Sequence, residues 1–120
     1  GNTDCALRDN GSFTCGFAQP YNPPMATLKV AGAEIPVPFG VSQVSYGGQA
    51  IPALPSFAAA EEYTLPGGNP DIDEVATGHS TWGPIVEYGG TTCQVGFHGS
   101  FSCTSGQHGY TTWSSSLAMN

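Results

Sequence analysis

Apolar and polar residues alternate in several short stretches of this 120-residue chain, a pattern typical of half-buried β-strands. The alternation is clearest over residues 41–46, and strands are also predicted over 27–30 and 108–113. A last group of strands is predicted to begin within 82–88. Eight prolines lie between residues 20 and 66, so the strands of that region are expected to be short or to lie at sheet edges.

One short helix is predicted over residues 56–63, where a proline precedes a serine cap and alanines and glutamates follow. It would have two turns at most, with Glu61 and Glu62 on its exposed face. Residues 65–80 are polar and rich in glycine and proline, which predicts a long surface loop.

The two ends of the chain contain the same motif. Residues 1–15 and 89–103 align with a constant offset of 88, and seven of the fifteen positions are identical. The motif contains all four cysteines, so that the cysteines form two equivalent pairs: Cys5 with Cys15, and Cys93 with Cys103.

Each copy of the motif is predicted to form a β-hairpin closed by a local disulfide. When the two cysteines of a copy face each other, three residues remain for the loop, and Gly11 or Gly99 takes its last, left-handed position. Alternation then places both cysteines on one apolar face of the hairpin. A crossed pairing, of Cys5 with Cys93 or Cys103, stays open at this point.

The composition favours a protein from an oxidising compartment. The chain has two basic residues (Lys and Arg together) and nine acidic ones (Asp and Glu together). The resulting net charge of −7 argues against nucleic acid and anionic membranes as partners. Nine residues separate the cysteines of each pair, too many for the close pairs of a zinc site, so disulfides are expected. No apolar run reaches the roughly 18 residues of a membrane span, and no signal segment stands at the start, so we expect a mature, processed chain.

These features predict a single secreted domain over residues 1–120. Its fold is expected to be mostly β, a small disulfide-stapled sandwich or partly open barrel with at most one short helix. The two cysteine hairpins are expected to be neighbours, as pseudo-symmetric halves, and Tyr110 and Leu117 are expected to enter the core.

Short motifs at both ends also resemble a known set of sequences. The chain starts Gly-Asn-x-x-Cys, has Tyr-Gly at 88–89 before the third cysteine, and has His-Gly-Tyr at 108–110. This pattern resembles small secreted proteins and lipoproteins of actinobacteria that end in Cys…Cys…Gly-His-Gly-Phe. The resemblance covers about forty residues, and here Gln107 and Tyr110 replace Gly and Phe. The resemblance implies an extracellular or cell-envelope location. It does not imply any particular activity, because those are domains of unknown function.

Three histidines, His79, His98 and His108, are the candidates for titration near neutral pH and for metal binding. His98 at a loop tip and His108 at a strand start could approach each other, with His79 or a nearby carboxylate as third ligand. Because no H-x-H or H-x-x-x-H spacing aligns two ligands on one element, exposed structural histidines are the preferred interpretation. No metal or cofactor is predicted.

Three further motifs have a simpler structural explanation. Ser80 lies in a sequence like the Gly-x-Ser-x-Gly nucleophile elbow, but one residue too long and not framed by a strand and a helix. Asp71, Asp73 and Glu74 are interpreted as an acidic surface loop, since the other positions of a calcium loop are missing. Residues 10–12 match an N-glycosylation acceptor, which turn chemistry explains.

Aromatic side chains offer one more candidate, a stacking platform for sugar, although most of them are expected to fill the core. They are Tyr46, Tyr63, Trp82, Tyr88, Tyr110 and Trp113.

The leading hypothesis is a non-catalytic extracellular or envelope module that binds a protein partner or an envelope component, or is a subunit of a homo- or hetero-assembly. No catalytic constellation is convincing, whereas Gly- and Pro-rich loops on a rigid scaffold suit binding. The alternatives are a metal-assisted hydrolase that uses His98 and His108, and an inhibitor of extracellular proteases that uses loop 67–78.

Overall fold

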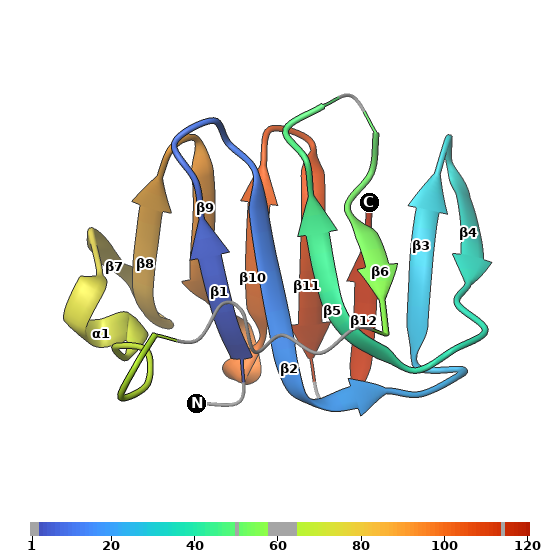
Figure 1. Cartoon of the computed structure of the whole chain (residues 1–120), viewed down its shortest axis with the longest axis horizontal. Coiled ribbons are helices and arrows are strands. Elements are labelled where there is room, and N and C mark those ends of the chain that lie inside the picture. The colour runs from blue at the N-terminus through green and yellow to red at the C-terminus, as the bar shows by residue number, and fades with distance from the viewer. Residues whose placement is uncertain (1–2, 50, 58–64, 114) are drawn as a thin grey trace.

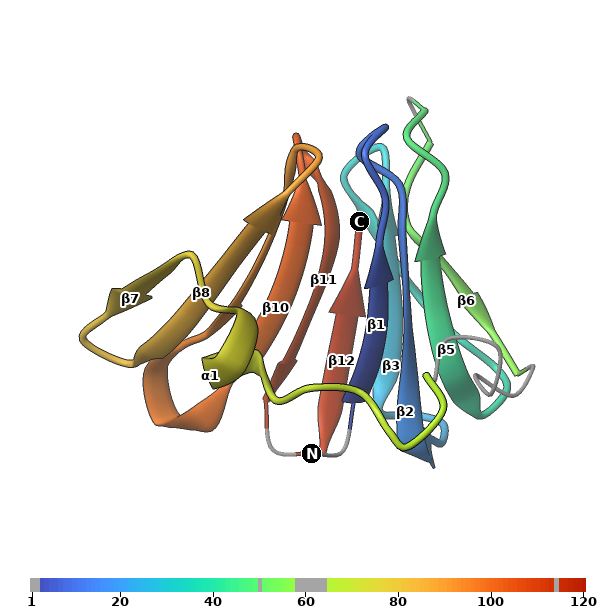
Figure 2. The ribbon, with the colours of Figure 1, turned by 60° about the vertical axis from the view of Figure 1, so that its left-hand side comes forward.

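The computed structural model describes residues 3–49, 51–57, 65–113 and 115–120. The chain forms two β-sheets that face each other, a small one in front and a larger one behind in Figure 1. Neither sheet closes on itself over the described ranges, so the protein is a sandwich and not a barrel. Figure 2 shows the two layers more nearly edge-on. The predicted mostly β, disulfide-stapled fold is confirmed.

The smaller sheet has the strand order β1-β2-β5-β6, and the larger sheet the order β4-β3-β12-β11-β10-β9-β8-β7. The strands of the smaller sheet are β1 (Thr3–Leu7), β2 (Phe13–Tyr21), β5 (Val41–Tyr46) and β6 (Leu54–Ser56). The strands of the larger sheet are β3 (Ala26–Val30), β4 (Ala33–Pro36), β7 (Gly78–Ser80), β8 (Gly83–Tyr88), β9 (Thr91–Val95), β10 (Phe101–Ser105), β11 (His108–Trp113) and β12 (Ser116–Met119).

The strands predicted from alternation are present. Strands β5 and β11 have the predicted bounds, and β3 and β8 differ from them by one residue. The short strands β4, β6 and β7 and the C-terminal β12 were not predicted. Strand β12 is antiparallel to β11 and parallel to β3, so it joins the end of the chain to an early strand.

The helix prediction was wrong in its described part. Ser56, its expected cap, belongs to β6, and residues 58–63 lie outside the described residues. Helix α1 is instead Ile72–Val75, inside the predicted surface loop 65–80. The helix forms there because two hydrogen bonds stabilise its first turn. The Asp71 N–H donates to Glu74 Oε1 (3.2 Å), and the Glu74 N–H donates to the Asp71 carbonyl (2.9 Å). The same segment also contains β7, which pairs with β8.

The core lies between the sheets, and both Tyr110 and Leu117 belong to it, as predicted. Phe13 lies near its centre, with ring centroids 6.0 Å from Tyr46 and 6.1 Å from Tyr110. The buried apolar residues are Phe13, Cys15, Ala26, Val37, Val41, Val44, Tyr46, Ala53, Cys93, Cys103, Tyr110, Leu117 and Met119.

Both cysteine hairpins have the register that the sequence predicted. Cys5 faces Cys15 in β1–β2, Cys93 faces Cys103 in β9–β10, and both disulfides are local, so the crossed pairing is excluded. The loops also agree, because the Arg8 N–H donates to Ser12 O (3.0 Å) and the N–H at the equivalent position 96 donates to the carbonyl at position 100 (2.7 Å). The loop glycines at positions 11 and 99 have φ values of +84° and +73°, the expected left-handed conformation.

Candidate functional site: a cleft along strand β1

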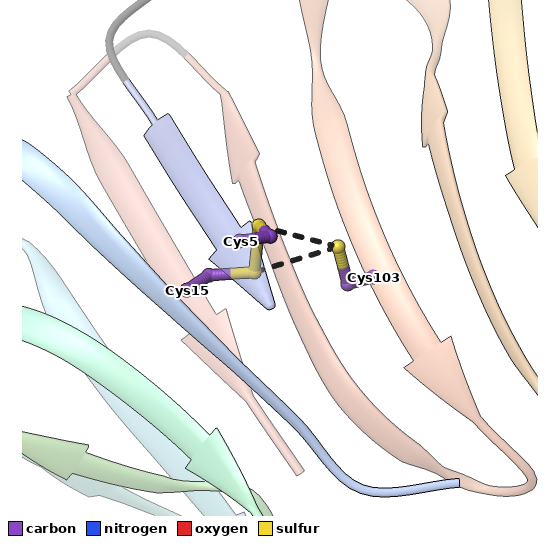
Figure 3. Close-up of side chains that lie close together, drawn as sticks. All are labelled: Cys5, Cys15 and Cys103. Atoms are coloured by element: carbon purple, nitrogen blue, oxygen red, sulfur yellow. Dashed lines mark hydrogen bonds between the residues drawn. A yellow bond between two sulfur atoms is a disulfide. The ribbon is translucent and has the colours of Figure 1, made fainter. Parts of the chain in front are cut away.

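The two disulfides touch in the middle of the sandwich. Cys103 Sγ lies 3.7 Å from Cys15 Sγ and 4.0 Å from Cys5 Sγ (Figure 3). Disulfide sulfurs carry no hydrogen, so these are packing contacts between the inner faces of the two sheets. The hairpins are therefore neighbours, as the internal repeat predicted.

The contact between the disulfides fits a structural role better than thiol exchange. In exchange, a thiolate attacks one sulfur and displaces the other, which requires an approach along the S–S bond. Cys103 Sγ is almost equally distant from Cys5 Sγ and Cys15 Sγ, so it lies beside that bond and not at its end. These three cysteines also form the one cluster of potential metal ligands found in the described residues, but as disulfides they offer no thiolate.

Tyr110 lies beneath the β1–β2 hairpin, with its hydroxyl 3.8 Å from Cys5 Sγ. Burial raises the pKa of the Tyr110 phenol far above its usual value, and the nearby Tyr21 raises it further. The Phe17 ring packs edge-on against the Tyr110 ring, at 5.6 Å between centroids. This tyrosine is thus a neutral core residue and not part of a sugar platform.

A cleft of about 360 Å³ runs along β1, between the two sheets. Its first wall is the whole of β1. Its floor is formed by Val86, Cys93 and Phe101 of the larger sheet. The second wall is α1 and the segment before it, and α1 packs beside β8 at one side of the sandwich (Figures 1 and 2). The lining residues are Thr3, Asp4, Cys5, Ala6, Leu7, Leu65, Asn69, Pro70, Ile72, Val75, Val86, Cys93 and Phe101.

The backbone of β1 faces this cleft with an edge that no described strand pairs. Among the described strands, β1 pairs with β2 alone. The Cα atoms of Cys5 and Cys15 are 4.1 Å apart, the spacing of a non-hydrogen-bonded antiparallel pair, whereas Arg8 bonds to Ser12. Because the two kinds of pair alternate, the N–H and C=O groups of the odd-numbered residues 3, 5 and 7 point away from β2, toward the open side.

Acidic side chains lie at one end of the cleft. An adjoining hollow of about 390 Å³ is lined by Asp4, Asp71 and Asp73, and it shares Phe101 with the cleft. The Asn69 amide donates to Asp4 Oδ1 at 3.0 Å and so ties the second wall to β1. The cleft therefore combines an apolar interior with an anionic end.

A larger hollow, of about 510 Å³, lies at the C-terminal end of β2 near Gln19, Asn22 and Met25, and it shares Thr3 with the cleft. We favour the β1 cleft as the site, because there an apolar interior coincides with open backbone hydrogen-bonding groups.

The three histidines are in separate surroundings. His79 is exposed in β7, His98 is exposed at the β9–β10 loop beside the Phe97 ring, and His108 stacks on Tyr46 at 5.4 Å. No group of three metal-binding side chains in the described part of the chain includes a histidine.

The other predicted candidates mainly serve turns and chain packing. Ser80 Oγ accepts the Trp82 N–H at 3.1 Å, and Asn10 Oδ1 accepts from both the N–H and the hydroxyl of Ser12. Asp71 and Glu74 start α1, and the loop proposed for protease inhibition is a wall of the cleft.

The predicted aromatic platform is divided between the core and the surface. Tyr46 is buried with Tyr110, whereas Trp82, Tyr88 and Trp113 are 53%, 54% and 46% exposed. Tyr63 lies outside the described residues. Trp82 precedes β8 and Tyr88 is its last residue, and Trp82 packs edge-on against Phe97 at 4.7 Å.

The cleft itself was not predicted from the sequence. Its second wall was predicted to be a plain loop, although the three-residue spacing of Ile72 and Val75 was a signal that one face of a helical turn is apolar. The open edge of β1 had no local signal, because it depends on which strands lie beside it.

The fold and the cleft define a small disulfide-clamped β-sandwich with an open strand edge. No helix among the described residues has the length and hydrophobicity needed to cross a membrane. No family model, curated protein or solved structure matches this chain.

Proposed function

We propose that this protein is a non-catalytic binding module of the extracellular space or cell envelope, and that it holds a protein partner in the cleft along β1. The observation that carries the proposal is the apolar cleft beside a strand edge that no described strand pairs. Open backbone groups next to apolar pockets are what a polypeptide partner needs, since hydrogen bonds supply affinity and the pockets supply specificity.

The other sheet edges support the choice of β1. Proteins usually protect edge strands by proline, charge or short length. Edge strands β4 and β6 contain Pro36 and Pro55, and edge strand β7 has three residues. Strand β1 has five residues and no proline, and its one charged residue, Asp4, already bonds to Asn69. It is the edge best suited to accept a partner.

The location is supported by the two disulfides, which persist in oxidising compartments. The resemblance of the chain ends to secreted actinobacterial domains agrees with it. No described feature favours the metal-assisted hydrolase or the protease inhibitor over a binding module.

The test is to capture a partner from an envelope extract and to ask where it binds. In Val75→Lys, a charge enters the wall of the cleft at a residue that is 47% exposed, so the fold is expected to remain intact. Val30→Lys is the matched control, on β3 outside the cleft and 37% exposed. We expect the first variant to lose the partner and the second to retain it. A wild-type protein that stays a partner-free monomer in gel filtration, or a complex that both variants retain equally, would falsify the proposal.

A further inference from the structure

The internal repeat shows what the β1 edge lacks. Strand β9, the counterpart of β1, has β10 on one side and β8 on the other, with Val86 opposite Cys93 and Glu87 opposite Thr92. Strand β1 has β2 on one side and no strand on the other in the described structure. With the offset of 88, Cys5 and Asp4 occupy the places of Cys93 and Thr92.

We propose that an extended segment of a partner protein adds to the smaller sheet as an antiparallel strand beside β1, in the position that β8 has beside β9, with a basic residue opposite Asp4. This inference rests on the proposed function and specifies its partner. The segment would enter the cleft between β1 and α1 and cover the floor there.

The backbone fixes the register of the incoming strand. The outward N–H and C=O groups of Cys5 pair with the residue that takes the place of Val86. That residue shares the face of Cys5, so its side chain points to the floor of the cleft, at Cys93 and Phe101. It must therefore be apolar. Five residues of β1 offer a contact of roughly 17 Å, at about 3.3 Å per residue.

Charge determines which residue type fits at the next position of the incoming strand. The incoming residue in the place of Glu87 lies opposite Asp4, with Asp71 and Asp73 around the adjoining hollow. A carboxylate there would oppose Asp4 across the pair, which is destabilising, whereas Lys or Arg would pair with it. The protein has a net charge of −7, which attracts the same kind of basic segment.

The probe is a capped six-residue peptide that copies β8, residues 83–88, with lysine in place of Glu87. Binding to the whole protein is followed by NMR titration of the backbone amides. We expect the largest shifts at Thr3 and Cys5, which lie opposite the places of Tyr88 and Val86. We also expect an affinity about tenfold higher than that of the unchanged β8 peptide, which keeps the glutamate. With Asp4→Asn, which keeps an acceptor for Asn69, this preference is expected to fall to about twofold or less.

Two methylated peptides distinguish strand addition from simple apolar contact. A methyl group on the peptide nitrogen in the place of Val86 removes the hydrogen bond to Cys5, so the affinity is expected to fall at least tenfold. A methyl group on the nitrogen in the place of Glu87, which points away from β1, is expected to change the affinity by about twofold at most.

Several outcomes would overturn the inference. These are no binding at millimolar peptide, equal effects of the two methyl groups, no charge preference, or shifts confined to other strands. A self-association through β1 that excludes the peptide would mean that a second copy is the occupant, and would overturn it too. If the peptide fails while the Val75→Lys variant still loses a captured partner, the strand-addition inference is wrong and the proposed function stands.

Discussion

The β1–β2 and β9–β10 hairpins have the same motif, the same register and the same disulfide, yet they occupy different places in the fold. The β9–β10 hairpin is inside the larger sheet, with β8 on one side and β11 on the other. The β1–β2 hairpin pairs with β5 on one side, and its other side opens into the cleft. The motif thus determines a hairpin but not the surroundings of that hairpin. One copy completes a sheet, and the other leaves an edge on which a binding site can form.

The largest expected difference concerns the equivalent phenylalanines. Phe13 is fully buried between Tyr46 and Tyr110, whereas Phe101 is half-buried at the floor of the cleft. We expect Phe13→Ala to lower the free energy of unfolding by about 4 kcal/mol and Phe101→Ala by about 2 kcal/mol. Guanidinium denaturation measures both. Equal losses would mean that the surroundings of the two hairpins do not differ in packing.

Removal of each disulfide tests whether the edge hairpin is held only by its own cross-link. The cysteines of both pairs are 10 residues apart, so the double alanine variants are each expected to lose about 3 kcal/mol of stability. Their local effects should differ. Without Cys5 and Cys15, amide hydrogen exchange in β1 should become much faster, whereas β9 should stay protected without Cys93 and Cys103 because β8 and β10 hold it on both sides. Equal acceleration in the two strands would contradict this comparison.

The loop glycines give a smaller difference. Both have left-handed backbones, but a Cβ at Gly11 would lie 3.2 Å from Ser105 Oγ, whereas a Cβ at Gly99 would have no atom within 4 Å. We expect a loss of about 1 kcal/mol for Gly99→Ala, from the left-handed conformation alone, and about 2 kcal/mol for Gly11→Ala. Thermal unfolding checks the order of the two. A greater loss at Gly99 would show that crowding at Gly11 has no effect.

The smallest effect is alkaline destabilisation through Tyr110, beneath the edge hairpin. Its raised pKa means that the folded protein keeps the phenol proton after the unfolded chain has lost it, so stability falls as pH rises above the unfolded value. For an unfolded pKa of about 10, the expected loss at about pH 10.5 is about 0.8 kcal/mol relative to neutral pH. The Tyr110→Phe variant should lose less stability than the wild type over the same pH range. A loss of the same size in both proteins would exclude this tyrosine as the cause.

The features that the sequence predicted well are local ones. The register of both hairpins followed from the cysteine spacing and from a glycine at the last loop position, and strands β5 and β11 followed from alternation. Helix α1 was missed because four residues carry too weak a periodicity beside Gly- and Pro-rich neighbours. Strand β12 was missed because it is short and obtains its partners from both ends of the chain.

The candidate site could not be predicted in the same way. Asp4 was not singled out, and Ile72 and Val75 were assigned to a loop, although all three line the cleft. The candidates that were singled out, His79, His98 and His108, are not brought together among the described residues. A site between two sheets depends on contacts between residues far apart in the chain, and alternation along the chain contains no information on them.

By itself the sequence favoured two cysteine hairpins, because turn geometry and side-chain alternation act over fewer than about fifteen residues. The structure then decided that each disulfide closes within its own hairpin. Only the tertiary structure decided that β8 pairs with β9 while β1 keeps an open edge. Strand order within a sheet is set by which apolar faces are buried together, and that is a property of the whole chain.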